Sequence, residues 1–260
     1  MNKRSWKRLL HGLARVIAAA GVTYACNDFL NVPAQGTVDE ATMATRTGVE
    51  GTLIAAYRSL DCSSSSAGAW GCAASNWVWG SVTSDDAYRG GSSGDYSPIS
   101  PIEIYEWGAS DVDGYLNQKW SQVYEGVTRA NAELRLLAKV RREKPAEISD
   151  ADGAGIRGEA LFLRAHYHFE AYRMWGRIPY YHEHDTDFRL SNQGVDVIGN
   201  LLADLDSAIA LLPATPRHGD RGRVTSWAAK AYKGRVQVYA GDDTGALVTL
   251  RDVRNNGPFA

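Results

Sequence analysis

Apolar residues recur every three or four positions along most of the chain, a spacing that predicts amphipathic α-helices. The clearest apolar stripe consists of Trp120, Tyr124, Val127, Ala130, Leu134, Leu137 and Val140. The same spacing predicts helices over about 47–60, 154–175, 196–212 and 225–239, and one more that begins at Asp243 or Thr244. Gly176 with Pro179 and, later, Pro213 provide stop signals after two of these helices. The fold class predicted from this pattern is mainly α.

Small residues in the helix predicted over 225–239 indicate close packing against a neighbouring helix. They are Ala228, Ala229, Ala231 and Gly234. Contacts of this kind are typical of tetratricopeptide-like helical hairpins, in which each hairpin covers the apolar face of the next. The fixed period of about 34 residues that defines the regular repeat is not visible. Irregular helical pairs therefore describe the chain better than a regular array.

The helical pattern is interrupted between Asp61 and Asp113, where Gly, Ser, Asp, Pro and aromatic residues dominate. An irregular insertion of this length usually has a function in a compact domain. A sugar presents an apolar C–H face and a rim of hydroxyls, so its site needs an aromatic platform edged with polar side chains. Residues that provide both are Trp77, Trp79, Asp85, Asp86, Tyr88, Arg89 and Tyr96. One tryptophan, more readily Trp79, could instead fill the helical core, and a peptide or another nutrient would need similar groups.

The N-terminus has the pattern of an export signal. Four basic residues within the first eight precede an apolar run over 16–22 that is too short to span a bilayer. We therefore expect residues 1–25 to be a signal peptide and the mature chain to begin at Cys26. A cysteine at this junction resembles a bacterial lipoprotein site, where Cys26 would be lipidated; the alternative is an ordinary secreted N-terminus. In an exported protein Cys62 and Cys72 could form a disulfide or remain free thiols.

The charge balance and the lack of standard motifs narrow the function further. With 28 Lys plus Arg against 30 Asp plus Glu, no basic excess indicates a nucleic-acid partner. The chain contains no His-Glu-x-x-His, Gly-x-Ser-x-Gly or phosphate-binding glycine motif, and neither a metal nor a cofactor is predicted. Glycoside hydrolysis remains an alternative because the insertion is rich in carboxylates. These are Asp85, Asp86, Asp95, Glu103 and Glu106.

Polar residues of the helix predicted over 154–175 are interpreted as structural. His166 and His168 are two positions apart and so point to different sides of a helix, which favours packing over shared metal binding. Glu159 is expected near the helix start, where its charge suits the dipole, and Arg164 is expected to reach another helix. His182 and His184, with Asp185 beside them, could hold a metal, but a surface loop is the preferred interpretation.

A series of short motifs, in order along nearly the whole chain, resembles the RagB/SusD family. The motifs include Cys26-Asn27-Asp28-Phe29-Leu30, Ala55-Ala56-Tyr57, Ser84-Asp85-Asp86, Ala130-Asn131, Gly158-Glu159-Ala160, Leu163-Arg164-Ala165, Trp175-Gly176-Arg177-Ile178-Pro179, Leu211-Leu212-Pro213 and Tyr239-Ala240-Gly241-Asp242. The resemblance implies a tetratricopeptide-like helical domain over residues 26–260 with a long irregular loop insertion. Because members of the family are commonly longer, it also implies that this chain is the N-terminal part of a longer protein.

The same resemblance implies a function. It predicts a lipid-anchored, surface-exposed protein of the outer membrane that binds a glycan or another nutrient, without catalysis and without a cofactor. Its partner would be the barrel of a SusC-like, TonB-dependent transporter. Two alternatives remain at this point: a helical-repeat scaffold with no small ligand, and a glycoside hydrolase.

Overall fold

The computed structural model describes residues 40–61, 77–92, 94–95, 97–108 and 113–259. The chain divides into two compact units, Met1–Thr42 and Met43–Ala260, and the described residues from Met43 onward belong to the second. Every regular element assigned within the described ranges is helical: α2 (Glu40–Met43), α3 (Arg46–Arg58), η2 (Val78–Val82), η3 (Ser97–Ile99), α4 (Ser100–Glu103), α5 (Asp113–Glu143), α6 (Asp150–Trp175), α7 (Val197–Leu211), η4 (Arg217–Gly219), α8 (Ser226–Tyr239) and α9 (Asp243–Asn256). The mainly α prediction is confirmed.

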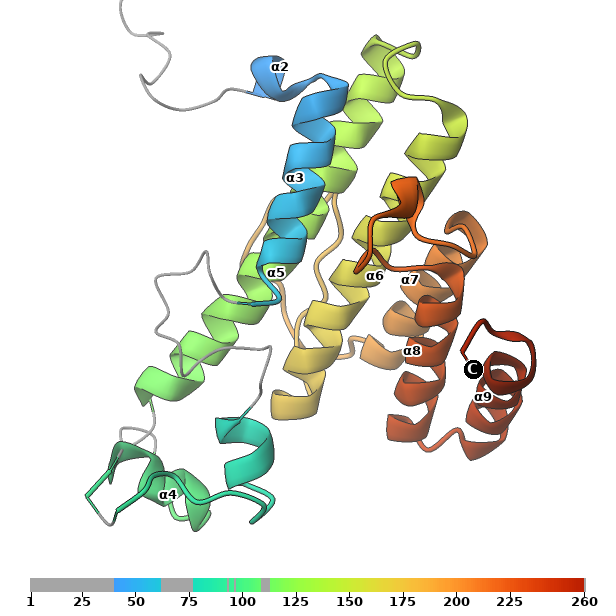
Figure 1. Cartoon of the computed structure of the whole chain (residues 1–260). Helices are drawn as coiled ribbons and strands as arrows, with labels where there is room; N and C mark the ends of the chain where they lie inside the picture. Colours follow the sequence, from blue (N-terminus) through green and yellow to red (C-terminus); the bar gives the residue numbers. More distant parts are fainter. Residues whose placement is uncertain (1–39, 62–76, 93, 96, 109–112, 260) are drawn as a thin grey trace, which may run out of the picture. The chain divides into compact units, whose positions relative to one another are not determined.

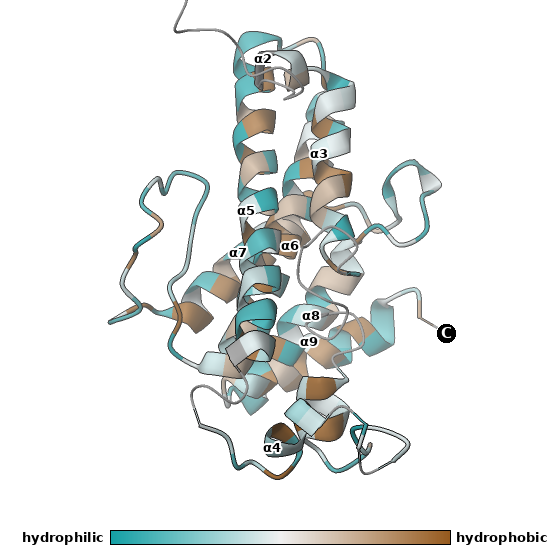
Figure 2. Cartoon of the chain, turned by 90° about the vertical axis from the view of Figure 1, so that its left-hand side faces the viewer, coloured by the Kyte–Doolittle hydropathy of each residue, from teal (hydrophilic) through white to brown (hydrophobic). Residues whose placement is uncertain are grey.

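Successive long helices pack against one another as pairs. α5 and α6 run antiparallel, and α3 lies against both of them (Figure 1). α7 then packs on α6, α8 on α7, and α9 on α8. On α5, hydrophilic and hydrophobic residues are mixed along the whole length of the helix (Figure 2), as expected for a helix with one buried face. This arrangement is the irregular helical pairing expected from the sequence.

Side-chain caps explain where the helices begin. Thr225 accepts a hydrogen bond from the Ala228 amide, which starts α8 at the predicted position. The helix predicted to begin near 154 begins earlier, at Asp150, because Ser149 caps it through the Asp152 amide. Its end is as predicted: Gly176 has φ of 67°, a conformation that suits glycine. The described part of the insertion contains only short helical turns.

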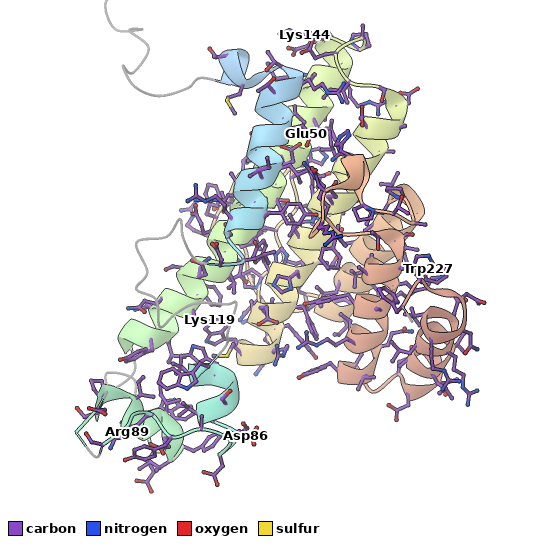
Figure 3. The ribbon with its side chains drawn as sticks, viewed as in Figure 1. Glu50, Asp86, Arg89, Lys119, Lys144 and Trp227 are labelled. Carbon is purple, nitrogen blue, oxygen red and sulfur yellow. The ribbon has the colours of Figure 1, made fainter. Side chains whose placement is uncertain are left out.

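Glu159 belongs to a buried charge cluster and not to the start of its helix, where it was expected. It is fully buried on α6 and accepts hydrogen bonds from Tyr57 Oη at 2.8 Å, Arg217 Nη1 at 2.8 Å and Arg223 Nη1 at 3.2 Å. Both arginines also pair with Glu50, which lies on α3 (Figure 3). The cluster therefore ties the segment before α8 to α3 and α6.

The contact between α5 and α6 depends on a glycine. A Cβ at Gly126 would lie 2.5 Å from the ring of Tyr167, whose side chain is fully buried and donates to Ala56 O. We expect Gly126→Ala to lower the free energy of unfolding by about 1–3 kcal/mol, because neither ring nor backbone can yield without strain. Chemical denaturation measures the change.

Gly51→Ala is the matched control for this prediction. Gly51 lies within α3, and a Cβ there would meet nothing within 4 Å. Alanine should therefore stabilise the protein by about 0.5–1 kcal/mol through helix propensity alone. Equal effects of the two substitutions would contradict a close α5–α6 approach at Gly126.

Candidate functional site

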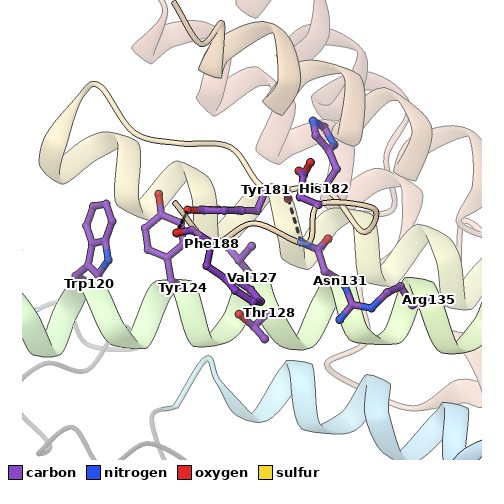
Figure 4. A pocket seen from close by; sticks show the side chains of 10 residues that line it. Trp120, Tyr124, Val127, Thr128, Asn131, Arg135, Tyr181, His182 and Phe188 are labelled. Atoms are coloured by element: carbon purple, nitrogen blue, oxygen red, sulfur yellow. Dashed lines mark hydrogen bonds between the residues drawn. The ribbon is translucent and has the colours of Figure 1, made fainter. Parts of the chain in front are cut away.

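A pocket lies between one face of α5 and the segment 179–190, which connects α6 to α7. Its cavity has a volume of about 220 Å³. The lining residues are Trp120, Tyr124, Val127, Thr128, Asn131, Arg135, Tyr181, His182, Asp185 and Phe188. The aromatic side chains occupy one end, whereas Asn131, Arg135 and His182 lie toward the other (Figure 4). The pocket is thus apolar at one end and polar at the other.

The aromatic end is a continuous row of rings. The Trp120 ring centroid lies 5.0 Å from that of Trp175 and 4.4 Å from that of Tyr124. Tyr124 contacts Tyr181 at 5.8 Å, and Tyr181 lies 6.5 Å from Phe188. Trp120 is 36% exposed and Phe188 is 76% exposed. These rings therefore offer accessible flat surfaces on which an apolar ligand face can stack.

Hydrogen bonds from α5 hold the opposite wall of the pocket. Tyr124 Oη donates to Pro179 O at 3.0 Å, Asn131 Nδ2 to Tyr181 O at 3.0 Å, and Arg135 Nη1 to Glu183 O at 3.2 Å. Burial, and next the charge of Tyr181, raise the pKa of Tyr124, so its hydroxyl keeps its proton. The wall, although it has no regular secondary structure, is fixed along its first five residues.

A buried polar cluster lies beneath the same wall. Arg164 of α6 makes a two-pronged contact with Asp204 of α7, in which Nε donates to Oδ2 and Nη2 to Oδ1, both at 2.7 Å. Its Nη1 donates to Asn131 Oδ1 at 3.0 Å and pairs with Glu183. Tyr180 Oη also donates to Asp204 Oδ2, at 2.7 Å. The expectation that Arg164 reaches another helix is confirmed, and the contact also fixes the wall.

His168 anchors the wall from the same helix. Its Nδ1 donates to Arg164 O at 3.0 Å, and its Nε2 accepts the Tyr181 amide proton at 3.1 Å. Burial lowers the pKa of His168 to about 3, so the ring is neutral and both nitrogens can play these roles. The ring also stacks on Tyr180, with centroids 3.8 Å apart. Its structural interpretation is confirmed.

The two tryptophans selected from the insertion are half-buried. Trp77 and Trp79 pack against a small core made by Val78, Val82, Ile99 and Ile102. The indole nitrogen of Trp79 is buried and finds no hydrogen-bond partner among the described residues. Their rings thus contribute at least part of their area to packing.

The polar residues selected from the insertion differ in accessibility. Asp85, Asp86 and Tyr88 are exposed, and Asp86 lies on the segment before α4 (Figure 3). Arg89 is buried, pairs with Glu103 at 3.2 Å and donates to Asp95 O, so its charge serves the local fold. Tyr96 lies outside the described residues, as do Cys26, Cys62 and Cys72. Of the selected residues that the structure describes, none lines the pocket on α5.

The carboxylates that suggested hydrolysis are partly committed to local structure. Asp95 accepts hydrogen bonds from the amides of Gly91 and Ser92, both at 2.8 Å, and Glu103 pairs with Arg89. Within the described ranges, no group of three or more His, Cys, Asp or Glu side chains is arranged to hold a metal ion. Asp185 accepts the His182 amide proton at 2.7 Å, and His184 is exposed.

Sequence reasoning missed the pocket because it assigned Trp120 and Tyr124 to a buried stripe. A signal was present: Thr128, Asn131 and Arg135 follow the two aromatics on the same helical face. A stripe that mixes aromatic and polar residues is less suited to a core than to a ligand surface.

Paired helices around an aromatic-walled pocket define a helical-hairpin binding scaffold. A SusD-like family model, described as starch-binding associating with outer membrane, matches residues 72–238. The chain belongs to this RagB/SusD family, which confirms the resemblance found in the motifs. No helix in the described part is both long and apolar enough to cross a membrane.

Individual relatives are similar over part of their length. The chain is 29% identical over 147 residues to a SusD-like protein of Bacteroides ovatus, covering 55% of this chain and 26% of that protein. A solved laminarin-binding SusD-like protein matches with a TM-score of 0.65 and 23% identity, covering 81% of this chain and 44% of that one. Surface glycan-binding protein A of Bacteroides thetaiotaomicron, solved with laminarihexaose, matches with a TM-score of 0.64 and 21% identity. The match covers 83% of this chain and 44% of that one. The chain thus spans less than half the length of these relatives.

Proposed function

We propose that this chain binds an oligosaccharide, without catalysis, in the pocket between α5 and the segment 179–190. The observation that carries this function is the row of accessible rings from Trp120 to Phe188, which leads into a polar end that contains Asn131 and Arg135. Sugar rings stack on such surfaces through their C–H faces while their hydroxyls bind at the rim. A laminarin-binding relative and a relative solved with laminarihexaose support the same ligand class.

The proposed location of this activity is the cell surface. We propose that the protein is anchored to the outer membrane through a lipid on Cys26, after removal of residues 1–25, and that it delivers its ligand to a SusC-like, TonB-dependent transporter. The family's description as associating with the outer membrane supports this location. In the insertion, the exposed Asp85, Asp86 and Tyr88 form a second surface that we propose contacts the ligand. Trp77, Trp79 and Tyr96 would complete this proposed surface, and the buried Arg89 would support it through its contacts with Glu103 and Asp95 O.

Removing the aromatic end tests the proposed site. We expect Trp120→Ala to weaken retention of the protein in affinity gels that contain laminarin or starch by about tenfold, because an exposed aromatic anchor is lost. Trp227→Ala is the matched control, since Trp227 lies on α8, outside the pocket (Figure 3). Its retention should equal that of the wild type.

The alternatives give different outcomes in the same assay. Equal retention of Trp120→Ala and the wild type, with weakened retention of Trp77→Ala, would move the ligand from α5 to the insertion. Release of reducing sugar would indicate a hydrolase. No affinity for any glycan, together with retained binding to the transporter barrel, would favour a helical scaffold.

A further inference from the structure

The polar end of the pocket contains a cation whose hydrogen-bonding edge is open. Arg135 is exposed, and its Nη1 donates to Glu183 O at 3.2 Å. The carboxylates of the described residues form no ion pair with Arg135, although Glu183 itself pairs with Arg164. The edge formed by Nε and Nη2 is therefore left for a ligand. That edge matches the two oxygens of a carboxylate.

Several other polar groups of the lining are already engaged within the protein, whereas the Thr128 hydroxyl and the His182 ring make no hydrogen bond to another described residue. Asn131 donates to Tyr181 O and accepts from Arg164. The hydroxyls of Tyr124 and Tyr181 donate to Pro179 O and Phe188 O. The carboxylate of Asp185, which is the one acidic side chain among the described residues of the lining, accepts the His182 amide proton. Arg135 is the only arginine or lysine among the described residues of the lining, so we assign ion-pair recognition of a charged ligand group to it.

We propose that the pocket selects oligosaccharides that contain a uronic acid. One sugar ring stacks on the rings of Trp120 and Tyr124, and the carboxylate of another sugar binds the Nε–Nη2 edge of Arg135. One extended oligosaccharide can reach both ends of the pocket. Trp120 and Arg135 lie fifteen positions apart on α5, which corresponds to a rise of ~22 Å along the helix axis. This selectivity rests on the proposed function, because it requires that the pocket binds an oligosaccharide.

Carboxyl reduction provides matched probes for this selectivity. Oligomers of galacturonate, glucuronate and mannuronate are each compared with their carboxyl-reduced forms, which keep the linkage and lose the charge. By isothermal titration, the wild-type protein should bind the acidic form of at least one pair about tenfold more tightly than its reduced form. Raising the ionic strength should reduce the difference, because the contact is accessible to solvent.

Substitution of Arg135 assigns the preference to its side chain. Arg135→Gln should abolish the preference for the acidic form, because it lowers the affinity for the acidic form far more than the affinity for the reduced form. Arg135→Lys should keep part of the preference, since it retains the charge without the two-pronged edge. Arg251→Gln, on the exposed surface of α9, is the matched control and should bind as the wild type does.

The outcomes separate this selectivity from the proposed function. If acidic and reduced forms bind equally, or only neutral glycans bind, the selectivity is wrong and oligosaccharide binding stands. If neither the uronates nor neutral glycans bind, the proposed function fails as well. If Arg135→Gln weakens both forms equally, Arg135 only supports the wall through Glu183 O, and its assignment to the carboxylate is overturned.

Discussion

Replacing Asp204 by alanine is expected to lower the free energy of unfolding by about 3–5 kcal/mol, because it leaves Arg164 with a buried and only partly compensated charge. Both side chains are less than a tenth exposed, and the contact is two-pronged with distances of 2.7 Å. Tyr180 also loses its hydrogen-bond acceptor. Urea denaturation followed by circular dichroism measures the loss.

Asp206→Ala is the control from the same helix. Asp206 is exposed on α7 and pairs with Lys233, so its removal should cost no more than about 1 kcal/mol. Asp204→Asn keeps the shape of the side chain but loses its charge. Its loss of free energy of unfolding should therefore lie between those of Asp206→Ala and Asp204→Ala. A loss for Asp204→Ala no larger than that for Asp206→Ala would show that the buried pair does not stabilise the fold.

The same substitution should also affect ligand binding through the pocket wall. Arg164 and Asp204 hold Tyr180, and Arg164 pairs with Glu183. Between these contacts, Tyr181 is fixed by His168 and Asn131. A wall that loses its buried support should sample several positions, so Asp204→Asn should weaken glycan retention even where the protein remains folded. The wall and the packing of α6 on α7 are therefore parts of one structural unit.

The helices were predictable because their physical signals are local. Apolar spacing identified α5 to α9, and Thr225 indicated where α8 begins, since its hydroxyl meets an amide only three residues away. The start of α6 was missed because the sequence before it, from Asp150 to Gly153, has no apolar periodicity, and Ser149 alone determines it. Boundaries set by one cap are weaker signals than stripes set by many residues.

The pocket was not predictable from local signals. Spacing places Trp120, Tyr124 and Asn131 on one face of α5, but it cannot show whether that face is covered. Its partner, the segment 179–190, has no periodicity and is positioned by contacts with residues far away in sequence, such as Tyr124 with Pro179 and Asn131 with Tyr181. Composition predicted that the ligand site would combine aromatic and polar residues. It assigned that site to the insertion, because a loop without a helical pattern can be recognised from sequence, whereas an uncovered face of a helix cannot.

Glu133 makes stability depend on pH in a direction opposite to that of most carboxylates. It lies on α5, is fully buried, and neither oxygen has a hydrogen-bond partner among the described residues. Burial, and next the charge of Glu50, raise its pKa to about 9, with Arg217 acting against the shift and Glu159 adding to it. The folded protein therefore holds a proton on Glu133 at neutral pH, whereas the unfolded chain, with a pKa near the ordinary 4.5, does not.

Glu133→Gln is expected to remove a loss of stability that develops as the pH rises. Between about pH 4.5 and pH 9 the folded state binds more protons at this site than the unfolded state, so the wild-type free energy of unfolding falls with increasing pH. Glutamine is neutral at every pH. The free energy of unfolding of the variant should therefore match that of the wild type near pH 4.5 and exceed it by several kcal/mol near pH 9. Urea denaturation across this range measures both curves. Glu143→Gln is the control at the exposed end of the same helix. A hydrogen bond from Arg142 lowers the pKa of Glu143, so this substitution should leave the slope above about pH 6 unchanged. If the stability of Glu133→Gln instead follows the wild-type pH curve throughout, Glu133 is ionised in the folded protein.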